Sequence, residues 1–375
     1  MKIAQLVLRN IRHFWAPNFW VAIGIAISTT VLTGGLIVGD SVIHSLEQSA
    51  RLRLGNISHA LVSGERFFTS DLALAIDEDG IPCSAALNLS GIVSSDGGQL
   101  KLNPVDVWGV DSRFSLVSSP SFPAFSVDVP DSLVFSGMPA FVSENMARRL
   151  NLKPGDPLLL RVGKVNTIPA NAPFVSDKDP VVSFRVWVQK ILNISEMGRL
   201  NLRNSQTAPF TIFLPLNGLS EQMGLQGRAN TLLLSTGASV GEIEGILKNR
   251  FTLDDAGLTI REAPLSDQWE IVSDRVFIDD ASVTAMENTG LSHDPILTYF
   301  VNSFRFGERE TPYSFISSLP GNRLGEGEII INEWLSGDLD AGASDSLVLN
   351  FYRMGSLREL EEVEISLRVK EVVPL

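Results

Sequence analysis

From Met1 to Phe14 the chain alternates between apolar and polar positions with the period of a helix. One side of the helical wheel carries Ile3, Leu6, Val7, Ile11 and Phe14, and the other carries Lys2, Gln5, Arg9 and Arg12. A basic amphipathic helix of this length is typical of a segment that lies flat on a membrane surface. We therefore expect residues 1–13 to form an interfacial helix on the cytoplasmic side, with membrane lipid as its partner.

The pattern then changes to continuous apolar sequence. No charged side chain occurs from Phe14 to Gly39, and the polar residues between Phe19 and Val38 are Ser28, Thr29, Thr30 and Thr33. Twenty helical residues span about 30 Å, the thickness of the hydrocarbon core of a membrane. This predicts a transmembrane helix at 14–39. The alternatives are a buried core helix and a cleaved signal peptide. A signal peptide would have a shorter apolar region, and helical periodicity continues from Gly39 to Ile43, where a cleavage site would be expected.

The helical stripe continues beyond the apolar segment through Ile43, Leu46, Ala50 and Leu54, and Gly55-Asn56 has the composition of a C-cap. Residues 40–55 are thus predicted to form a helical stalk. The basic residues before the span place the N-terminus in the cytoplasm by the positive-inside rule, with residues after about 40 on the periplasmic side of the cell (inner) membrane. Arg51 and Arg53 on the far side weaken this asymmetry only slightly.

The remainder of the chain mixes short strands, short helices and Gly/Pro turns. We expect strands at 85–93, 100–110, 231–234 and 270–278, a helix at 242–250, a turn at Asp96-Gly97-Gly98 and a loop at 163–180. The predicted fold class is α+β, with a mixed α/β extracytoplasmic domain of two related β-rich lobes. The first lobe covers 56–260 and the second covers 261–375.

An internal repeat carries the prediction of two lobes. The segment Phe141–Val162 matches Ile330–Phe351 at a constant offset of 189 in residue number, and each copy is followed by an alternating strand, at 182–191 and at 363–372. Glu144/Glu333, Leu150/Leu339, Asp156/Asp345, Leu158/Leu347 and Leu160/Leu349 are identical pairs. Two copies of a strand, helix, turn, strand and strand indicate a duplication; the alternative is chance similarity between short β-rich segments.

The charge and the cysteine content exclude two features, a nucleic-acid partner and an intrachain disulfide. The 375 residues carry a net charge of −13, divided into +3 for residues 1–13 and −16 for the rest. An acidic chain lacks the basic surface that a phosphate backbone requires, which excludes nucleic acid as a partner. A single cysteine, Cys83, cannot form an intrachain disulfide.

Motifs for catalysis, cofactors and metals are weak throughout. Gly237-Ala-Ser239-Val-Gly241 has the spacing of a nucleophile elbow, with His293 as the one downstream histidine, but Ser239 and Glu242 also form a helix capping box. The segment Asp77–Gly80 resembles an incomplete calcium loop and is better explained as a solvated acidic turn. No phosphate-binding loop is present, and the four histidines are not spaced as zinc ligands. We therefore predict no catalytic residue, no cofactor site and no metal site.

Several segments together resemble the N-terminal part of the FtsX-like, MacB-type ABC transporter permeases. The first is Leu6–Asn56, which contains an L-R-N motif, the apolar span and a stalk that begins with G-D-S. The other three are PVDVWGVDSRF at 104–114, FVSENMARRLNLKPGDPLLLRV at 141–162, and LTYFVNSFRFGERETPYS at 297–314. The family has four spans in its small form, whereas this chain has one and ends directly after a strand, so a second lobe truncated at its C-terminus is expected. Ser344 at the turn glycine and Gly337 inside the helix also depart from the first copy.

The resemblance implies a mechanotransmission permease. Such a subunit is not itself an enzyme: a cytoplasmic ATP-binding-cassette ATPase hydrolyses ATP, a second permease copy or homologue completes a dimer, and the extracytoplasmic domain exports or extracts a lipoprotein, lipid, peptide or drug. Two other classes stay open: a single-pass receptor or sensor with a ligand-binding ectodomain, and a membrane-anchored hydrolase that uses Ser239.

Overall fold

The computed structural model describes residues 3–95, 100–125, 137–163, 181–203, 208–263, 267–273, 275, 278–319, 323–354 and 360–374. The predicted turn at Asp96–Gly98 and the predicted loop after Gly163 lie outside these ranges. The chain divides into two compact units. Unit 1 comprises Met1–Val165 and Pro180–Gly257, and unit 2 comprises Asn166–Asp179 and Leu258–Leu375.

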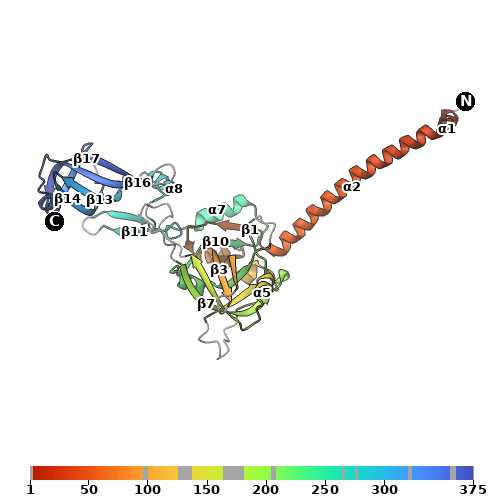
Figure 1. The fold of residues 1–375 in the computed structure, drawn as a ribbon, viewed down its shortest axis with the longest axis horizontal. Helices are drawn as coiled ribbons and strands as arrows, with labels where there is room; N and C mark the ends of the chain where they lie inside the picture. The colour runs from red at the N-terminus through yellow and green to blue at the C-terminus, as the bar shows by residue number, and fades with distance from the viewer. Residues whose placement is uncertain are drawn as a thin grey trace. The chain divides into compact units, whose positions relative to one another are not determined.

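Unit 1 begins with two consecutive helices, α1 (Ile3–His13) and α2 (Trp15–Leu54), as the apolar pattern predicts. Phe14 separates them with a backbone conformation (φ −102°, ψ 36°) outside the helical region. Pro17 explains the break, because proline has no N–H to donate to the carbonyl of His13 one turn earlier. The 40 residues of α2 form one uninterrupted helix (Figure 1), so the apolar segment and the stalk are continuous.

A closed ring of six strands forms the centre of unit 1. Its strands are β3 (Cys83–Ser95), β4 (Lys101–Val110), β8 (Thr211–Pro215), β5 (Met138–Ser143), β7 (Val181–Leu192) and β6 (Pro157–Gly163). The ring closes because β3 pairs with β4 and also with β6, whereas β10 (Thr231–Leu234) and β1 (His59–Val62) extend the sheet from β3. The short strands β2 (Phe68–Thr69) and β9 (Arg228–Ala229) pair separately.

Alternation along the strands divides the interior of unit 1 into two apolar clusters. In β8, Ile212 and Leu214 belong to the larger cluster, whereas Phe213 belongs to a smaller aromatic cluster on the opposite face. This is the period-two alternation of a strand that is buried on both faces. The surrounding helices are α3 (Asp71–Glu78), α4 (Phe114–Val117), α5 (Glu144–Leu150), the 3₁₀ helix η1 (Ile194–Glu196), α6 (Leu216–Met223) and α7 (Val240–Arg250).

Unit 2 contains a five-stranded sheet with the order β14-β13-β16-β17-β15. Its elements are β13 (Thr298–Phe306), β14 (Arg309–Ser317), β15 (Glu328–Asn332), α9 (Glu333–Leu339), β16 (Ser346–Met354) and β17 (Leu360–Val373). Leu335 and Leu339 of α9 pack on the sheet together with Ile331, Leu347 and Val369. A separate hairpin, β11 (Leu258–Glu262) with β12 (Trp269–Ser273), and α8 (Asp280–Glu287) precede the sheet.

The sequence repeat has a structural counterpart in both units. β5 pairs in parallel with β7, and β15 pairs in parallel with β17; β6 and β16 each pair with the same partner in the antiparallel direction. The register of the parallel pair shifts between Ala140 and Phe141 in one copy and between Ile329 and Ile330 in the other. These two positions differ by 189 in residue number, which is the offset of the sequence repeat. The pairing and even the irregularity are therefore repeated.

Most predicted elements are confirmed within the described residues. Strands β3, β4 and β10 and helix α7 form where the pattern places them. The strand expected at 270–278 is shorter than predicted, because β12 ends at Ser273. Helix α9 runs through Gly337 without interruption.

Candidate functional site

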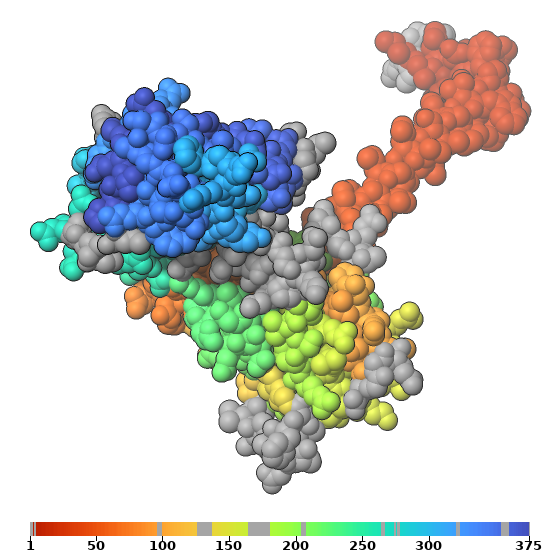
Figure 2. All heavy atoms as spheres, turned by 60° about the vertical axis from the view of Figure 1, so that its left-hand side comes forward, coloured from red at the N-terminus to blue at the C-terminus, as the bar shows by residue number. Residues whose placement is uncertain are grey.

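Helix α2 is long and apolar enough to cross a membrane, and among the described residues it is the one helix that meets this criterion. None of its side chains is buried within the chain, and its surface is the red rod of Figure 2. The hydroxyl of Thr30 donates to the carbonyl of Ala26 at 2.7 Å, and that of Ser45 donates to the carbonyl of Ser41 at 2.8 Å. Each bond satisfies a hydroxyl within the helix by pairing it with a carbonyl one turn earlier.

The end of α2 is joined to the strand ring of unit 1 at Gly55. This residue has φ 59° and ψ −126°, and its N–H donates to the carbonyl of Arg51 at 2.9 Å. A Cβ atom at this position would lie 2.7 Å from the Sδ atom of Met197 and 3.1 Å from the backbone nitrogen of Ser119. Only glycine accommodates both the backbone angles and the close approach. The predicted C-cap is thus confirmed, and it is also a packing contact.

The partner of Gly55 is held in a tightly bonded turn. Met197 is fully buried, follows η1 and has a left-handed backbone (φ 65°). Asn193 and Glu196 form a capping box around η1, and Lys190 Nζ lies 2.7 Å from Glu196 Oε1. Burial opposes ionisation of the Glu196 carboxylate, but bonds from Lys190 and the Asn193 N–H outweigh it and lower the pKa. The turn beneath Gly55 is therefore held by a charged hydrogen-bond network.

Beyond Met197 lies the aromatic cluster of unit 1. Its buried members include Trp108, Phe114, Phe122, Phe141 and Phe213, with Leu54 of α2 packed at the edge. Ring centroids lie 4.7 Å apart for Phe114 and Phe122 and 5.3 Å apart for Phe122 and Phe213. Close-packed protein interiors have low compressibility and transmit strain. We call Leu54, Gly55, Met197 and this aromatic cluster the junction.

Ser239 is explained by local structure. It is the N-cap of α7, and it forms the predicted capping box: the backbone N–H of Glu242 donates to Ser239 Oγ at 3.4 Å, and Glu242 Oε2 accepts the Ser239 N–H at 2.8 Å. The Ser239 hydroxyl also donates to Glu242 Oε2 at 2.9 Å. His293 is exposed, with Nδ1 3.1 Å from the carbonyl of Leu291. Neither contact joins a serine to a histidine.

The acidic segment at 77–80 lies at the end of α3 and is exposed from Glu78 to Gly80, as predicted, but its carboxylates also form ion pairs. Asp77 forms an ion pair with Arg113, and both oxygens of Asp79 accept from Arg250, at 2.9 and 2.6 Å. The bond from Arg250 lowers the pKa of Asp79. The carboxylates thus tie α3 to distant parts of unit 1, and sequence could not show this because their arginine partners lie 36 and 171 residues away. In the described ranges no group of three or more His, Cys, Asp or Glu is placed to hold a metal ion.

Unit 1 also contains the buried thiol of Cys83 and the half-buried carboxylate of Asp111. Burial raises the pKa of the Cys83 thiol to about 12, which keeps it protonated and unreactive. Burial also raises the pKa of Asp111, whose carboxylate accepts from the Ser84 hydroxyl at 2.6 Å. The protonated Cys83 thiol is therefore not poised as a nucleophile near neutral pH.

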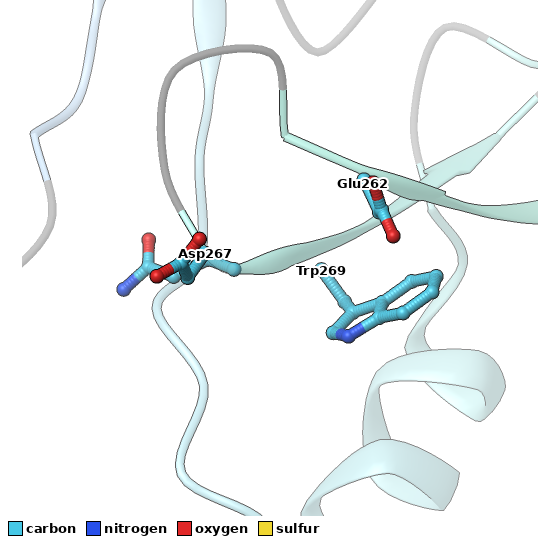
Figure 3. Close-up of a pocket in the computed structure, with 4 residues that line it drawn as sticks. Glu262, Asp267 and Trp269 are labelled. Carbon is cyan, nitrogen blue, oxygen red and sulfur yellow. The ribbon is translucent and has the colours of Figure 1, made fainter.

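A shallow hollow in unit 2 lies at the β11–β12 hairpin. Glu262, Asp267, Gln268 and Trp269 line it (Figure 3), and Glu262 and Trp269 are directly opposite each other in the strand register. Trp269 is 68% exposed. The four described residues that line the hollow are all exposed, so it is a surface feature of the hairpin.

The junction is the part of the site that sequence reasoning missed. The pattern predicts a C-cap at Gly55, but Met197 lies 142 positions later and nothing near it in sequence indicates the contact. The one local signal is the Asn193-to-Glu196 spacing, which is that of a capping box.

No family model matches the chain, and no curated protein matches it. Among solved structures, it is similar to the extracellular domain of the noncanonic ABC-type transporter YknZ from Gram-positive bacteria, at 12% identity and a TM-score of 0.31, over 57% of this chain and 100% of that one. It is also similar to the periplasmic region of MacB from Actinobacillus actinomycetemcomitans, at 12% identity and a TM-score of 0.28, over 62% of this chain and 95% of that one. These neighbours, a noncanonic ABC-type transporter and MacB, are of the kind that the resemblance of the sequence to MacB-type permeases predicts.

Proposed function

We propose that this chain is a permease subunit of an ABC transporter of the FtsX/MacB mechanotransmission type. A partner ATPase in the cytoplasm hydrolyses ATP, and the chain converts the resulting movement into export or extraction of a lipoprotein, lipid, peptide or drug outside the membrane. The observation that carries this proposal is the continuity of α2. One helix runs from the basic helix α1 to the junction without a break.

The mechanics follow from the contacts. An uninterrupted helix resists bending, since its backbone hydrogen bonds are internal, so a displacement at Trp15 reaches Leu54. At Gly55 the helix contacts the buried Met197, and the N–H of Ser58 then donates to the carbonyl of Leu234 at 2.9 Å. Movement of α2 therefore acts on η1 and on strand β10 together. The function needs no catalytic residue in this chain.

The proposed orientation has the N-terminus in the cytoplasm and residues after about 40 outside it. Its test uses single added thiols, Gln5→Cys and Glu65→Cys, and a maleimide that does not cross membranes. Cys83 can stay in place because it is buried and its pKa is about 12. Labelling of the Glu65→Cys protein in intact cells, with labelling of the Gln5→Cys protein only after lysis, supports the proposal. The reverse pattern would overturn it.

Coupling is tested by reconstituting the chain with its partner ATPase in lipid nanodiscs. Gly55→Val places a branched side chain against Met197. We expect this variant to bind the ATPase normally but to have a smaller effect on the rate of ATP hydrolysis than the unmodified chain. Gly64→Val is the matched control, because Gly64 also has positive φ (66°) but nothing lies within 4 Å of the position that its Cβ would take. A receptor or sensor would instead show no association with an ATPase at all, which separates the two functions.

A further inference from the structure

Helix α7 is linked to the end of α2 by two separate sets of polar contacts, one at each end of α7. The first runs through Ser58, in the segment that follows α2. Its hydroxyl oxygen accepts the N–H of Thr236 at 2.9 Å, and its own N–H donates to the carbonyl of Leu234 at 2.9 Å. Thr236 Oγ1 then accepts the N–H of Ala238 at 3.1 Å, directly before the N-cap residue Ser239. The start of α7 is therefore held by the chain that leaves the junction.

The second link starts at α4, which packs in the junction. Phe114 of α4 lies in the aromatic cluster, and a Cβ atom on Gly55 would lie 3.1 Å from the backbone nitrogen of Ser119, just beyond α4. At the start of α4, the guanidinium of the N-cap residue Arg113 forms an ion pair with Asp77 of α3. These two side chains are 21% and 30% exposed, so solvent screens their attraction less than that of a surface pair. A displacement of α4 thus acts on the C-terminal end of α3.

The end of α3 is bonded in turn to the end of α7. Asp79, the C-cap residue of α3, accepts from Nε and Nη2 of Arg250 at 2.9 and 2.6 Å. Two parallel bonds between a carboxylate and a guanidinium fix their relative orientation as well as their distance. Arg250 is the last residue of α7. The link from the junction to this end of α7 therefore consists of two ion pairs whose carboxylates lie two positions apart on α3.

Arg250 directly precedes the segment 251–257, which ends at the boundary of unit 1 after Gly257. Asp255 holds this segment in a folded turn and is 6% exposed. Its carboxylate accepts from the Thr69 N–H at 3.0 Å and from the N–H and hydroxyl of Thr252 at 2.9 and 2.7 Å. A shift of Arg250 therefore displaces a bonded turn and is not absorbed by a free linker.

We propose that α7 carries a displacement of α2 to the segment 251–257, with Asp77 and Asp79 as positioning residues. The apolar contacts of α7 lie along its length, where Ile243 and Ile246 pack on the larger cluster, whereas its ends are held by the two polar links. Removing the Asp79 contact should therefore release one end of α7 and leave the helix packed. The inference rests on the proposed function for the source of the movement, but the links lie within unit 1 and are measured without an ATPase.

A double-mutant cycle followed by hydrogen exchange tests the proposal on the whole 375-residue protein in lipid nanodiscs. Gly55→Val displaces the end of α2, and Asp79→Asn breaks the ion pair with α7. Gly55→Val should speed amide exchange at 248–257 about threefold or more, and should no longer do so once Asp79→Asn is present. The amides of 242–243 should keep their response, because the first link is intact. Glu144→Gln is the matched control, because it removes an exposed ion pair within α5 and should leave the effect of Gly55→Val unchanged.

Additive effects of Gly55→Val and Asp79→Asn overturn the proposal, because Asp79 would then only stabilise unit 1. Unchanged exchange at 248–257 in Gly55→Val also overturns it. Asp79→Glu keeps a carboxylate and should restore the response. Arg250→Gln breaks the same pair from α7 and decides the matter if Asp79→Asn lowers the yield of folded protein. The proposed function fails by a different result, the absence of association with an ATPase, and that result leaves the cycle unaffected.

Discussion

Asp156 and Asp345 make the same hydrogen bond in the equivalent turns of the two repeat copies. The carboxylate of Asp156 accepts from the N–H of Lys153 at 2.7 Å, and that of Asp345 accepts from the N–H of Gly342 at 2.8 Å. The residues before them also agree, since the N–H of Gly155 donates to the carbonyl of Val188 in β7 and the N–H of Ser344 donates to that of Val369 in β17, both at 2.7 Å. Equivalent residues of the two copies thus form the same hydrogen bonds. Where the copies differ, the effect of the difference on stability can be tested.

Ser344 is the clearest such difference. It holds φ at 79°, where the first copy has Gly155 with φ 96°. A non-glycine residue in this region costs about 1 kcal/mol, so Ser344→Gly should stabilise unit 2 by roughly 0.5–1 kcal/mol. Gly155→Ser should destabilise unit 1 by about 1 kcal/mol. Urea unfolding followed separately in each unit measures both changes, and a destabilising Ser344→Gly would contradict the comparison.

Gly55→Ala should destabilise unit 1 at the junction. The added Cβ meets Met197 Sδ at 2.7 Å and Ser119 N at 3.1 Å, and the backbone angles are those of glycine. The combined cost is about 1–3 kcal/mol, measured as a lower unfolding midpoint. Gly64→Ala carries the cost of positive φ without the contacts and should lose less stability. Equal losses in the two variants would show that the contact with Met197 contributes nothing.

Ser239→Ala should cost about 1 kcal/mol of stability and no chemistry. The substitution removes the hydroxyl that accepts the Glu242 N–H at the start of α7, and loss of an N-cap has this magnitude. Ser239→Asp keeps an accepting oxygen and should recover most of the loss. An esterase activity that disappears in Ser239→Ala but persists in an equally destabilised variant would instead support the alternative function of a membrane-anchored hydrolase.

The Glu196 network predicts how the stability of the junction depends on pH. The pKa of Glu196 is lower in the folded chain than its ordinary value of 4.5. Its contribution to stability is therefore fully present above that ordinary value and is lost as the pH falls through the lower folded value. Unfolding measured between about pH 3 and pH 7 should show this loss in the unmodified protein and not in Glu196→Gln. Lys190→Met, which removes one of the bonds that lower the pKa, should shrink the loss.

Local pattern predicted the local features of the molecule well. The break near Phe14, the continuous stalk, the C-cap at Gly55 and the capping box at Ser239 depend on residues within one or two turns of each other. The repeat could be found from 141 onward because its apolar positions and its Glu and Asp residues keep one spacing.

The contacts set by the tertiary fold were not predictable in this way. The hairpin β13–β14 takes the place of β3–β4 by its pairing alone, since its residues do not follow the offset of 189. Arg250 reaches Asp79 across 171 positions, and Met197 reaches Gly55 across 142. In each case many other residues of the same type could make the contact, and only the tertiary fold determines which of them lies close enough.

The length of α2 has a mechanical consequence. Its 40 residues, at about 1.5 Å each, make a lever of about 60 Å. A tilt of about 5° at one end of such a lever moves the other end sideways by roughly 5 Å, about one helical turn. With Leu54 and Gly55 as the fulcrum, a sideways displacement of about 5 Å near Phe14 corresponds to a rotation of about 5° at the junction, so a rigid α2 would convert a movement the size of a side chain into a small rotation without any change in its own fold.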